Sequence, residues 1–193
     1  MDPRWESDTA GAPWRAVDRP PVPWKNGLGV QYEITCDGSL PDEWTWRLST
    51  ADITQDVPFS VFPGVNREFC VADGNGVVLN INGVDHRCVP GSITKFRGDD
   101  VVFATLIDGP MRALNLMVRD GAAEKHLQLV CAVASIDMTK TEAIVAVTGH
   151  AKLQQNWDEV VLETLDSQLV LNSEKFAGET LCVVVEGCAV ATV

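Results

Sequence analysis

The chain has 193 residues and a formal net charge of −12, from 15 Lys and Arg against 27 Asp and Glu. This acidic balance disfavours a nucleic-acid partner, because nucleic-acid binding depends on clustered Lys and Arg. No apolar run approaches the roughly 20 residues of a membrane-spanning helix, and the polar opening residues do not fit a secretory signal. We therefore expect a cytoplasmic protein with no nucleic-acid or membrane partner, and with room for one domain or two small fused halves.

The start of the chain differs in composition from the remainder. Residues 1–23 hold five prolines and little periodicity, which predicts an irregular arm that lies across the body of the protein. The segment from Pro23 to Gly29 then reads Pro-Trp-Lys-Asn-Gly-Leu-Gly. Its two glycines allow positive φ and a close approach by other groups. Since Asn-Gly is typical of a tight turn, a hairpin turn with a surface tryptophan is its simplest interpretation.

Short strand-like segments make up the next part of the chain. They are predicted at residues 28–36, 43–53, 67–72, 77–82, 92–96, 101–107 and 113–119. Turn signals such as Pro63-Gly64 and Asn82-Gly83 separate them. Many short strands with this punctuation predict an all-β sandwich or barrel rather than βαβ units.

A second β-rich portion begins after Gly121. Its predicted strands are residues 125–134, 143–147, 160–165, 169–172 and 180–193. Residues 181–193 are nearly all apolar, which predicts a pair of core strands turned at Glu186-Gly187, and residues 174–176 could hold a short helical turn. We expect three parts: an arm (1–23), a first β-rich half (24–120) and a second one (121–193).

Strand alternation gives three of these segments an unusual second face. The side chains that share it are Gln31, Glu33 and Thr35, then Thr45, Arg47 and Ser49, then Asn115, Met117 and Arg119. A sheet surface that faces solvent would alternate in the same way, but it would be richer in Lys and Glu, whereas this mixture suits a pocket with a few placed polar groups. Because the planar fork of Arg holds a carboxylate bidentately, rows that converge inside a barrel mouth would suit a small anion.

Cysteine and histidine do not indicate metal or redox chemistry. The six cysteines include no C-x-x-C pair, so we interpret most of them as buried thiols that act as small hydrophobes. A metal site needs three or four convergent ligands, whereas His86, His126 and His150 lie dozens of residues apart. We expect no metal and no cofactor. Ser49 and Ser60 have no evident histidine partner, which makes a nucleophilic triad improbable.

Five ordered blocks resemble the HutD/Ves family over roughly residues 14–120. They are Trp24-Lys25-Asn26-Gly27-x-Gly29 with Glu33, Trp46-Arg47-Leu48-Ser49-x-Ala51, Pro58-Phe59-Ser60-x-Phe62-Pro63-Gly64 with Arg67, Phe96-x-Gly98-Asp99, and Leu114-Asn115-Leu116-Met117-x-Arg119. The resemblance implies a cupin-type double-stranded β-helix barrel, with two cupin-like halves packed in one chain. The chain departs from the family pattern at Gln31, Tyr32, Val57 and Asn66.

The same resemblance implies a function and a site. The family is thought to bind a small acid such as formylglutamate beside the histidine-utilisation pathway, as a regulator rather than a catalyst. Carried over by position, the pocket residues are Asn26, Glu33, Arg47, Ser49, Arg67 and Asn115, with Trp24 and Phe59 as walls.

These residues leave three hypotheses for the function. The first is a metal-free binding protein in which Arg47 or Arg67 pairs with a ligand carboxylate. Within it, Glu33 receives a ligand NH, holds an arginine in place or simply pairs with Arg47 across neighbouring strands. The second is a metal-independent enzyme, an isomerase or hydrolase of an amino-acid derivative, with Glu33 as general base. The third is an interaction module whose apolar C-terminal third forms a homodimer.

Overall fold

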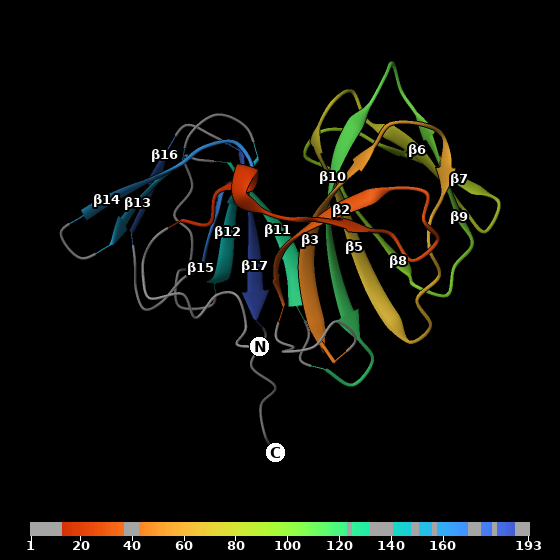
Figure 1. Cartoon of the computed structure of the whole chain (residues 1–193), viewed down its shortest axis with the longest axis horizontal. Helices are drawn as coiled ribbons and strands as arrows, with labels where there is room; N and C mark the ends of the chain where they lie inside the picture. Colours follow the sequence, from red (N-terminus) through yellow and green to blue (C-terminus); the bar gives the residue numbers. More distant parts are fainter. Residues whose placement is uncertain are drawn as a thin grey trace. The chain divides into compact units, whose positions relative to one another are not determined.

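The structure of the protein is a computed structural model. It describes residues 13–36, 43–122, 125–131, 141–147, 151–155, 158–169, 175–178 and 181–187. These residues form two compact units (Figure 1). The first unit takes its described residues from 20–36 and 43–122, and the second takes them from 13–19 and from the segments after 122.

The first unit contains a six-stranded antiparallel sheet. Its spatial order is β1 (Pro21–Pro23), β2 (Val30–Cys36), β3 (Trp46–Ile53), β10 (Met111–Arg119), β5 (Val65–Asp73) and β8 (Ile93–Arg97). The longest strands, β3, β5 and β10, lie side by side at its centre (Figure 1). Their register is continuous except for a shift between Arg112 and Ala113 where β10 pairs with β5.

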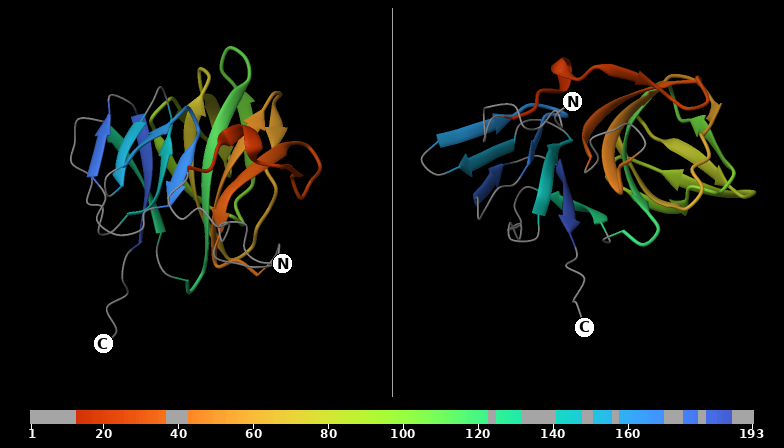
Figure 2. Two further views of the ribbon diagram at one scale, coloured as in Figure 1. Left: turned by 60° about the vertical axis from the view of Figure 1, so that its left-hand side comes forward. Right: turned by 60° about the horizontal axis from the view of Figure 1, so that its bottom comes forward.

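A four-stranded antiparallel sheet completes the first unit. Its order is β4 (Val57–Pro58), β9 (Val102–Leu106), β6 (Val77–Ile81) and β7 (Val84–Cys88). One buried core joins the two sheets, because Phe69 and Val71 from the first pack in the same cluster as Leu79 and Ala104 from the second. Fully burying a side chain such as Phe69 or Leu79 contributes about 1.5–3 kcal/mol. Figure 2 shows the strands of this unit curving around that core.

The second unit is also built from antiparallel strands. One sheet has the order β11 (Lys125–Cys131), β17 (Leu181–Gly187), β12 (Thr141–Ala146) and β15 (Ser167–Leu169). The other has the order β14 (Asp158–Leu162), β13 (Ala151–Gln155) and β16 (Lys175–Gly178).

The N-terminal segment is tied into the second unit before the chain enters the first. Trp14 forms a bridge to Ser167, and a 3₁₀ turn, η1 (Ala16–Asp18), comes directly after it. Arg19 is buried and donates to the Leu165 carbonyl at 2.8 Å and to Ser167 Oγ at 2.9 Å. The chain therefore leaves the second unit after Arg19 and pairs as β1 in the first.

The all-β class is confirmed, and each predicted strand overlaps an observed one. The differences are local. Residues 21–23, predicted within the irregular arm, form β1, and the turn-like segment around His86 is the exposed strand β7. The helical turn predicted at 174–176 is wrong, because Lys175 and Phe176 pair with β13 in strand β16; residue 174 lies outside the described residues.

The turn predicted at Glu186-Gly187 is also wrong. Both residues continue β17, where Glu186 lies opposite His126 and Gly187 opposite Lys125. The pairing with β11 satisfies the backbone groups that a turn would have redirected. Residues 188–193, the second strand of the predicted pair, lie outside the described residues.

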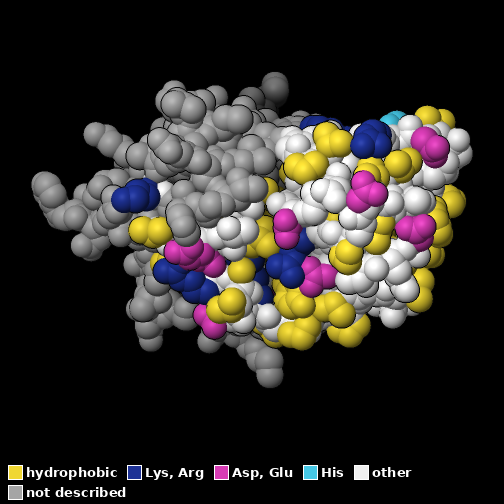
Figure 3. Space-filling view, turned by 90° about the horizontal axis from the view of Figure 1, so that it is seen from above, with side chains coloured by type: hydrophobic (Ala, Val, Ile, Leu, Met, Phe, Trp, Pro, Cys, Tyr) yellow, Lys and Arg dark blue, Asp and Glu magenta, His cyan; other side chains and the backbone are white. Residues whose placement is uncertain are grey.

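Two surface properties bear on the sequence-based expectations. None of the described residues forms a helix with the length and hydropathy that crossing a bilayer requires. On the face seen in Figure 3, described Lys and Arg side chains lie beside acidic ones, and this part of the surface carries no continuous basic stripe.

Candidate functional site

The predicted polar rows meet on adjacent strands of the six-stranded sheet. Ser49 on β3 lies opposite Asn115 on β10. Arg47 lies opposite Met117, which itself lies opposite Arg67 on β5. Since directly opposed residues of antiparallel strands share a face of the sheet, the side chains of all five lie on one face.

That face is the inner face of the first unit. Along β3 and β10 the same side continues into Ile53 and Ala113, which belong to the core between the two sheets. Ser49 is 1% exposed, Asn115 6% and Arg67 9%. These low values contradict the interpretation of the polar rows as a sheet surface that faces solvent.

The face predicted to hold the core is buried as well. Leu48, Leu114 and Leu116, on the opposite side of β3 and β10, are fully buried. Alternation therefore separated the two faces of β3 and β10 correctly, but both are buried, and the face with the arginines is the one that joins the core between the sheets. On β2 the prediction is wrong for Thr35, because the irregularity after Glu33 places Thr35 opposite Leu48, on the other face.

We call the group around the two arginines the inner-face cluster. It consists of Arg47, Ser49, Arg67, Asn115, Met117, Phe59, Phe62 and Phe96.

Arg67 is the centre of the inner-face cluster. Its Nε and Nη2 both donate to Asn115 Oδ1, at 3.3 and 3.2 Å, and its Nη1 donates to the Ser60 carbonyl at 3.4 Å. The guanidinium carbon lies 4.9 Å from the ring centroid of Phe96 and 5.2 Å from that of Phe59. The rings and the neutral oxygens hold the cation by cation–π contacts and hydrogen bonds.

The charge of Arg67 has no acidic counterpart in the part of the chain that the structure describes. Every ion pair among those residues joins other side chains. Burial, and secondly the positive charge of Arg47, lower the pKa of Arg67 to about 9. Both effects disfavour the charged form of the guanidinium, and a negative charge beside it would offset them.

Arg47 borders Arg67 from the neighbouring strand. Its Nη2 lies 3.4 Å from the thioether sulfur of Met117, the residue between the two arginines in the register. Its guanidinium carbon lies 5.1 Å from the ring centroid of Trp44 and 5.6 Å from that of Phe62. Phe62 also lies 5.9 Å from the Arg67 guanidinium, so one ring contacts both cations.

Glu33 lies at the edge of this arrangement, on β2 opposite Ser49. It is half-buried, and its Oε1 accepts a weak hydrogen bond from Cys36 Sγ at 3.6 Å. Among the described residues no ion pair joins Glu33 to Arg47, so the simple cross-strand pair is not formed. The residue opposite Arg47 is Cys36, and Glu33 lies opposite Ser49, two residues farther along β3.

Asn26 and Trp24 belong to a loop that supports the inner-face cluster from outside. Asn26 is exposed; its Nδ2 donates to the Pro58 carbonyl at 3.0 Å, and its Oδ1 accepts the Leu28 N–H at 3.1 Å. These bonds tie the loop to the segment before Phe59. The Trp24 ring stands edge-on to Phe59, with centroids 6.0 Å apart. Trp24 therefore packs behind Phe59, the other residue predicted as a pocket wall.

Gly29 explains the spacing of the first sequence block. A Cβ at this position would lie 2.7 Å from the Trp24 ring. The Trp24 N–H also donates to the Gly29 carbonyl at 2.9 Å. Only glycine lets the indole pack across this backbone, so the block builds a support for Phe59.

Comparison with known proteins gives this arrangement a context. The HutD family model matches residues 16–190. An uncharacterized 21.2 kDa protein in the hutC 3′ region of Pseudomonas putida is 34% identical over 149 residues, which cover 76% of this chain and 78% of that protein. This chain belongs to the HutD family.

Other family members are similar over different lengths. Protein Ves of Citrobacter koseri is 39% identical over 98 residues, about half of each chain (50% and 51%). HutD from Pseudomonas fluorescens SBW25, solved in a formate condition, has a TM-score of 0.76 and 31% identity, and the match covers 93% of this chain and all of that one (100%).

More distant solved structures identify the fold. A cupin 2 conserved barrel domain protein from Leptotrichia buccalis matches with a TM-score of 0.56 at 10% identity, over 83% of this chain and 89% of that one. At this identity the likeness shows the fold alone, which is a cupin-type β fold.

Within this HutD family member, sequence analysis missed several residues that complete the site. Phe62 and Phe96 contact the Arg67 guanidinium, and Trp44 contacts that of Arg47. Phe62 and Phe96 stand inside two of the five family blocks, and Met117 stands in the polar row. The aromatic residues and the methionine near the arginines in these blocks could have indicated them, because a buried guanidinium without an acidic partner is stabilised by aromatic faces and by sulfur acceptors.

The described residues contain no group of three or more His, Cys, Asp and Glu arranged to hold a metal ion. His86 is exposed on β7, and His126 lies on β11. His150 lies outside the described residues.

Proposed function

We propose that this HutD family member is a metal-independent binding protein for a small carboxylate. The observation that carries the proposal is Arg67, a buried cation with no acidic partner among the described residues and a second arginine beside it. Uncompensated buried charge is costly. A ligand carboxylate would accept the bidentate hydrogen bonds that arginine is shaped to give.

Each residue of the site takes a role in this proposal. Arg67 and Arg47 pair with the carboxylate. Asn115 orients Arg67, because its Oδ1 already holds two guanidinium nitrogens. Ser49 orients the ligand from the adjacent row, and Glu33 receives a ligand NH at the edge.

The supporting residues act indirectly in this proposal. Phe59 forms a wall and Trp24 holds it in place, since the two rings are in contact. Asn26 fixes the loop that carries Trp24 through its bond to the Pro58 carbonyl.

The family to which the chain belongs guides the choice of acid to test. A relative lies in the hutC 3′ region of P. putida, and a solved relative is named HutD. We therefore propose a formylglutamate-like ligand and a regulatory rather than catalytic role near histidine utilisation, in the cytoplasm. We further propose that the two β units correspond to two cupin-like halves, since both are built from antiparallel sheets.

The test is a thermal-shift screen of the purified protein against urocanate, formiminoglutamate, formylglutamate and glutamate, with and without divalent metals. Each acid is also incubated with the protein and followed by chromatography. A metal-independent rise in melting temperature with one unconsumed acid is the expected result. Consumption of the acid would instead support the enzyme hypothesis with Glu33 as general base, and no shift with any acid would refute the binding proposal.

Arg47→Ala tests the assignment within the site. We expect it to abolish the ligand-induced shift while the unliganded protein melts near the wild-type temperature, because the guanidinium serves the ligand more than the core. Truncating one partner of a buried charge pair costs about 3–5 kcal/mol. A much lower melting temperature without ligand would therefore make Arg47 a structural residue.

A further inference from the structure

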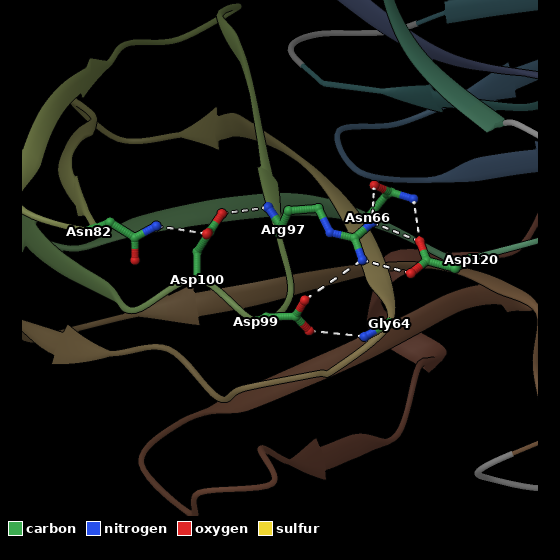
Figure 4. A network of polar contacts seen from close by, with 7 residues as sticks. All are labelled: Gly64, Asn66, Asn82, Arg97, Asp99, Asp100 and Asp120. Atoms are coloured by element: carbon green, nitrogen blue, oxygen red, sulfur yellow. Dashed lines mark hydrogen bonds and ion pairs between the residues drawn. The ribbon is translucent and has the colours of Figure 1, made fainter.

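Arg97 organises the polar network drawn in Figure 4. The network lies on the side of β5 and β8 opposite the inner-face cluster, because Asn66 and Arg97 are one residue from Arg67 and Phe96 along their strands. Its Nη1 donates to Asn66 Oδ1 at 2.6 Å and to Asp120 Oδ1 at 2.7 Å, and its Nη2 donates to Asp120 Oδ2 at 2.7 Å. Its backbone N–H donates to Asp100 Oδ2 at 2.7 Å. The fork-to-fork contact with Asp120 fixes the orientation of both groups.

This network lies directly behind Arg67. In the register of β5 and β8, Asn66 lies opposite Arg97 and the next pair is Arg67 opposite Phe96. The bond from Arg97 to Asn66 therefore joins the two strands one residue pair away from Arg67 and Phe96. The ring centroid of Phe96 lies 4.9 Å from the Arg67 guanidinium.

The network also fixes Phe62, the ring that contacts both inner arginines. Asp99, which lies 3.7 Å from Arg97 Nη2, accepts the Gly64 N–H at 2.9 Å. The Phe62 N–H donates to the Gly98 carbonyl at 2.8 Å. A Cβ on Gly98 would lie 2.1 Å from the Phe62 carbonyl oxygen, so the two segments touch backbone to backbone.

A third branch leads to Arg47. Asp120 directly succeeds Arg119, whose Nε donates to the Trp44 carbonyl at 2.8 Å and whose guanidinium carbon lies 4.4 Å from the Trp44 ring centroid. The same ring contacts Arg47 at 5.1 Å. Asp120 thus connects Arg97 to the residue that carries the aromatic support of Arg47.

We propose that Arg97 is a positioning residue for the two inner-face arginines. Its three branches end beside Phe96, Phe62 and Trp44, which are aromatic neighbours of Arg67 and Arg47. Arg97 sets where the two guanidinium groups lie and thereby the affinity for an anion between them. This inference rests on the proposed function and assigns a role to the unspecified position of the Phe96-x-Gly98-Asp99 block.

The test separates positioning from plain stabilisation. Arg97→Met and Arg97→Lys are compared with Arg112→Met. Arg112 is a matched control, because its side chain is 37% exposed against 40% for Arg97 and it also pairs with an aspartate, Asp52. The probe is formylglutamate, and its Kd is measured by calorimetry well below every melting temperature.

We expect Arg97→Met to raise Kd about tenfold and Arg97→Lys to raise it by less, because lysine keeps the charge and loses the fork. Arg112→Met should lower the melting temperature comparably and leave Kd within about twofold of wild type. A Kd within about twofold of wild type for Arg97→Met, with a lowered melting temperature, would overturn the proposal.

A second measurement keeps the inference testable if the wild type does not bind formylglutamate, which would count against that ligand alone. The side-chain Nε–H signals of Arg67 and Arg47 are followed by NMR in the same variants without ligand. Ring currents from Phe96 and Trp44 make these signals sensitive to position. Arg97→Met should move both and Arg112→Met neither; unmoved signals in Arg97→Met would overturn the proposal.

Discussion

Arg67 and Arg97 occupy adjacent rungs of the same strand pair and have opposite surroundings. Arg67 faces inward, is 9% exposed, and is held by an amide oxygen, a carbonyl and aromatic rings. Arg97 faces outward and forms a bidentate pair with Asp120 through Nη1 and Nη2. Burial lowers the pKa of Arg67 to about 9, whereas the hydrogen bond to Asp120 raises the pKa of Arg97.

The contrast lies in how the charge of each arginine is balanced. The exposed carboxylates of Asp99 and Asp120 lie beside Arg97, and neither forms an ion pair with Arg67. An interior cation kept apart from acids costs stability that packing must offset. Proteins retain such costs at functional sites, which is why it is informative that Arg67 has no acidic partner among the residues that the structure describes.

The largest expected effect comes from removing the inner charge. Arg67→Met should raise Kd for the carboxylate about 100-fold or more, since losing one partner of a buried charge pair costs about 2–5 kcal/mol or more. Its melting temperature should stay level or rise, because an apolar side chain removes the desolvation cost. Calorimetry measures Kd, and thermal denaturation measures the melting temperature. A large fall in melting temperature would mean that Arg67 stabilises the fold, as an arginine paired with an acid does.

The pH dependence of binding sharpens the contrast. Only the protonated guanidinium attracts an anion, and the ligand raises the pKa of Arg67 from its lowered value of about 9. Affinity should therefore be level from about pH 6 to 8 and fall above about pH 9 as free Arg67 loses its proton. Calorimetry at stepped pH tests this. A level Kd up to about pH 10.5 would assign the attraction to Arg47 alone.

The smallest expected effect is on the melting temperature and comes from the pair of Arg97 and Asp120. The hydrogen bond from Arg97 lowers the pKa of Asp120 below its ordinary 3.8. A lowered folded-state pKa stabilises the protein above the ordinary value, and the benefit is lost as pH falls through the folded value. Asp120→Asn should slightly lower the melting temperature at about pH 6 and leave it unchanged in strong acid; a gap that persists there would not come from this ionisation.

Part of the site was readable from the sequence because strand alternation is local. Arg47, Ser49 and Asn115 were placed on one face by counting residues, and the register brings them together. The meeting of Arg67 with Asn115 came from the resemblance, since nothing in either segment specifies that β5 pairs with β10. Alternation also could not show which face is inner, because Leu48 and Leu114 on the other side are equally buried.

The strand β7 and the contacts of Arg19 were missed for different physical reasons. β7 comes after Asn82 and Gly83, whose φ values of 52° and 89° fit the hairpin turn that Asn-Gly favours. The exposed residues of β7 are polar enough to be predicted as a loop, although the hairpin turn before them indicates a second strand. Arg19 gave no signal at all, because its acceptors at Leu165 and Ser167 lie 146 and 148 residues away.

That distance has a consequence for how the chain is made. Arg15 and Arg19 are translated about 150 residues before their partners at Val161, Leu165 and Asp166. At about 5–20 residues per second, the N-terminal segment waits roughly 7–30 s for them. The first unit has all of its strands by Arg119, so the order of synthesis lets the unit that holds Arg67 and Arg47 fold before Arg15 and Arg19 meet their partners in the second unit.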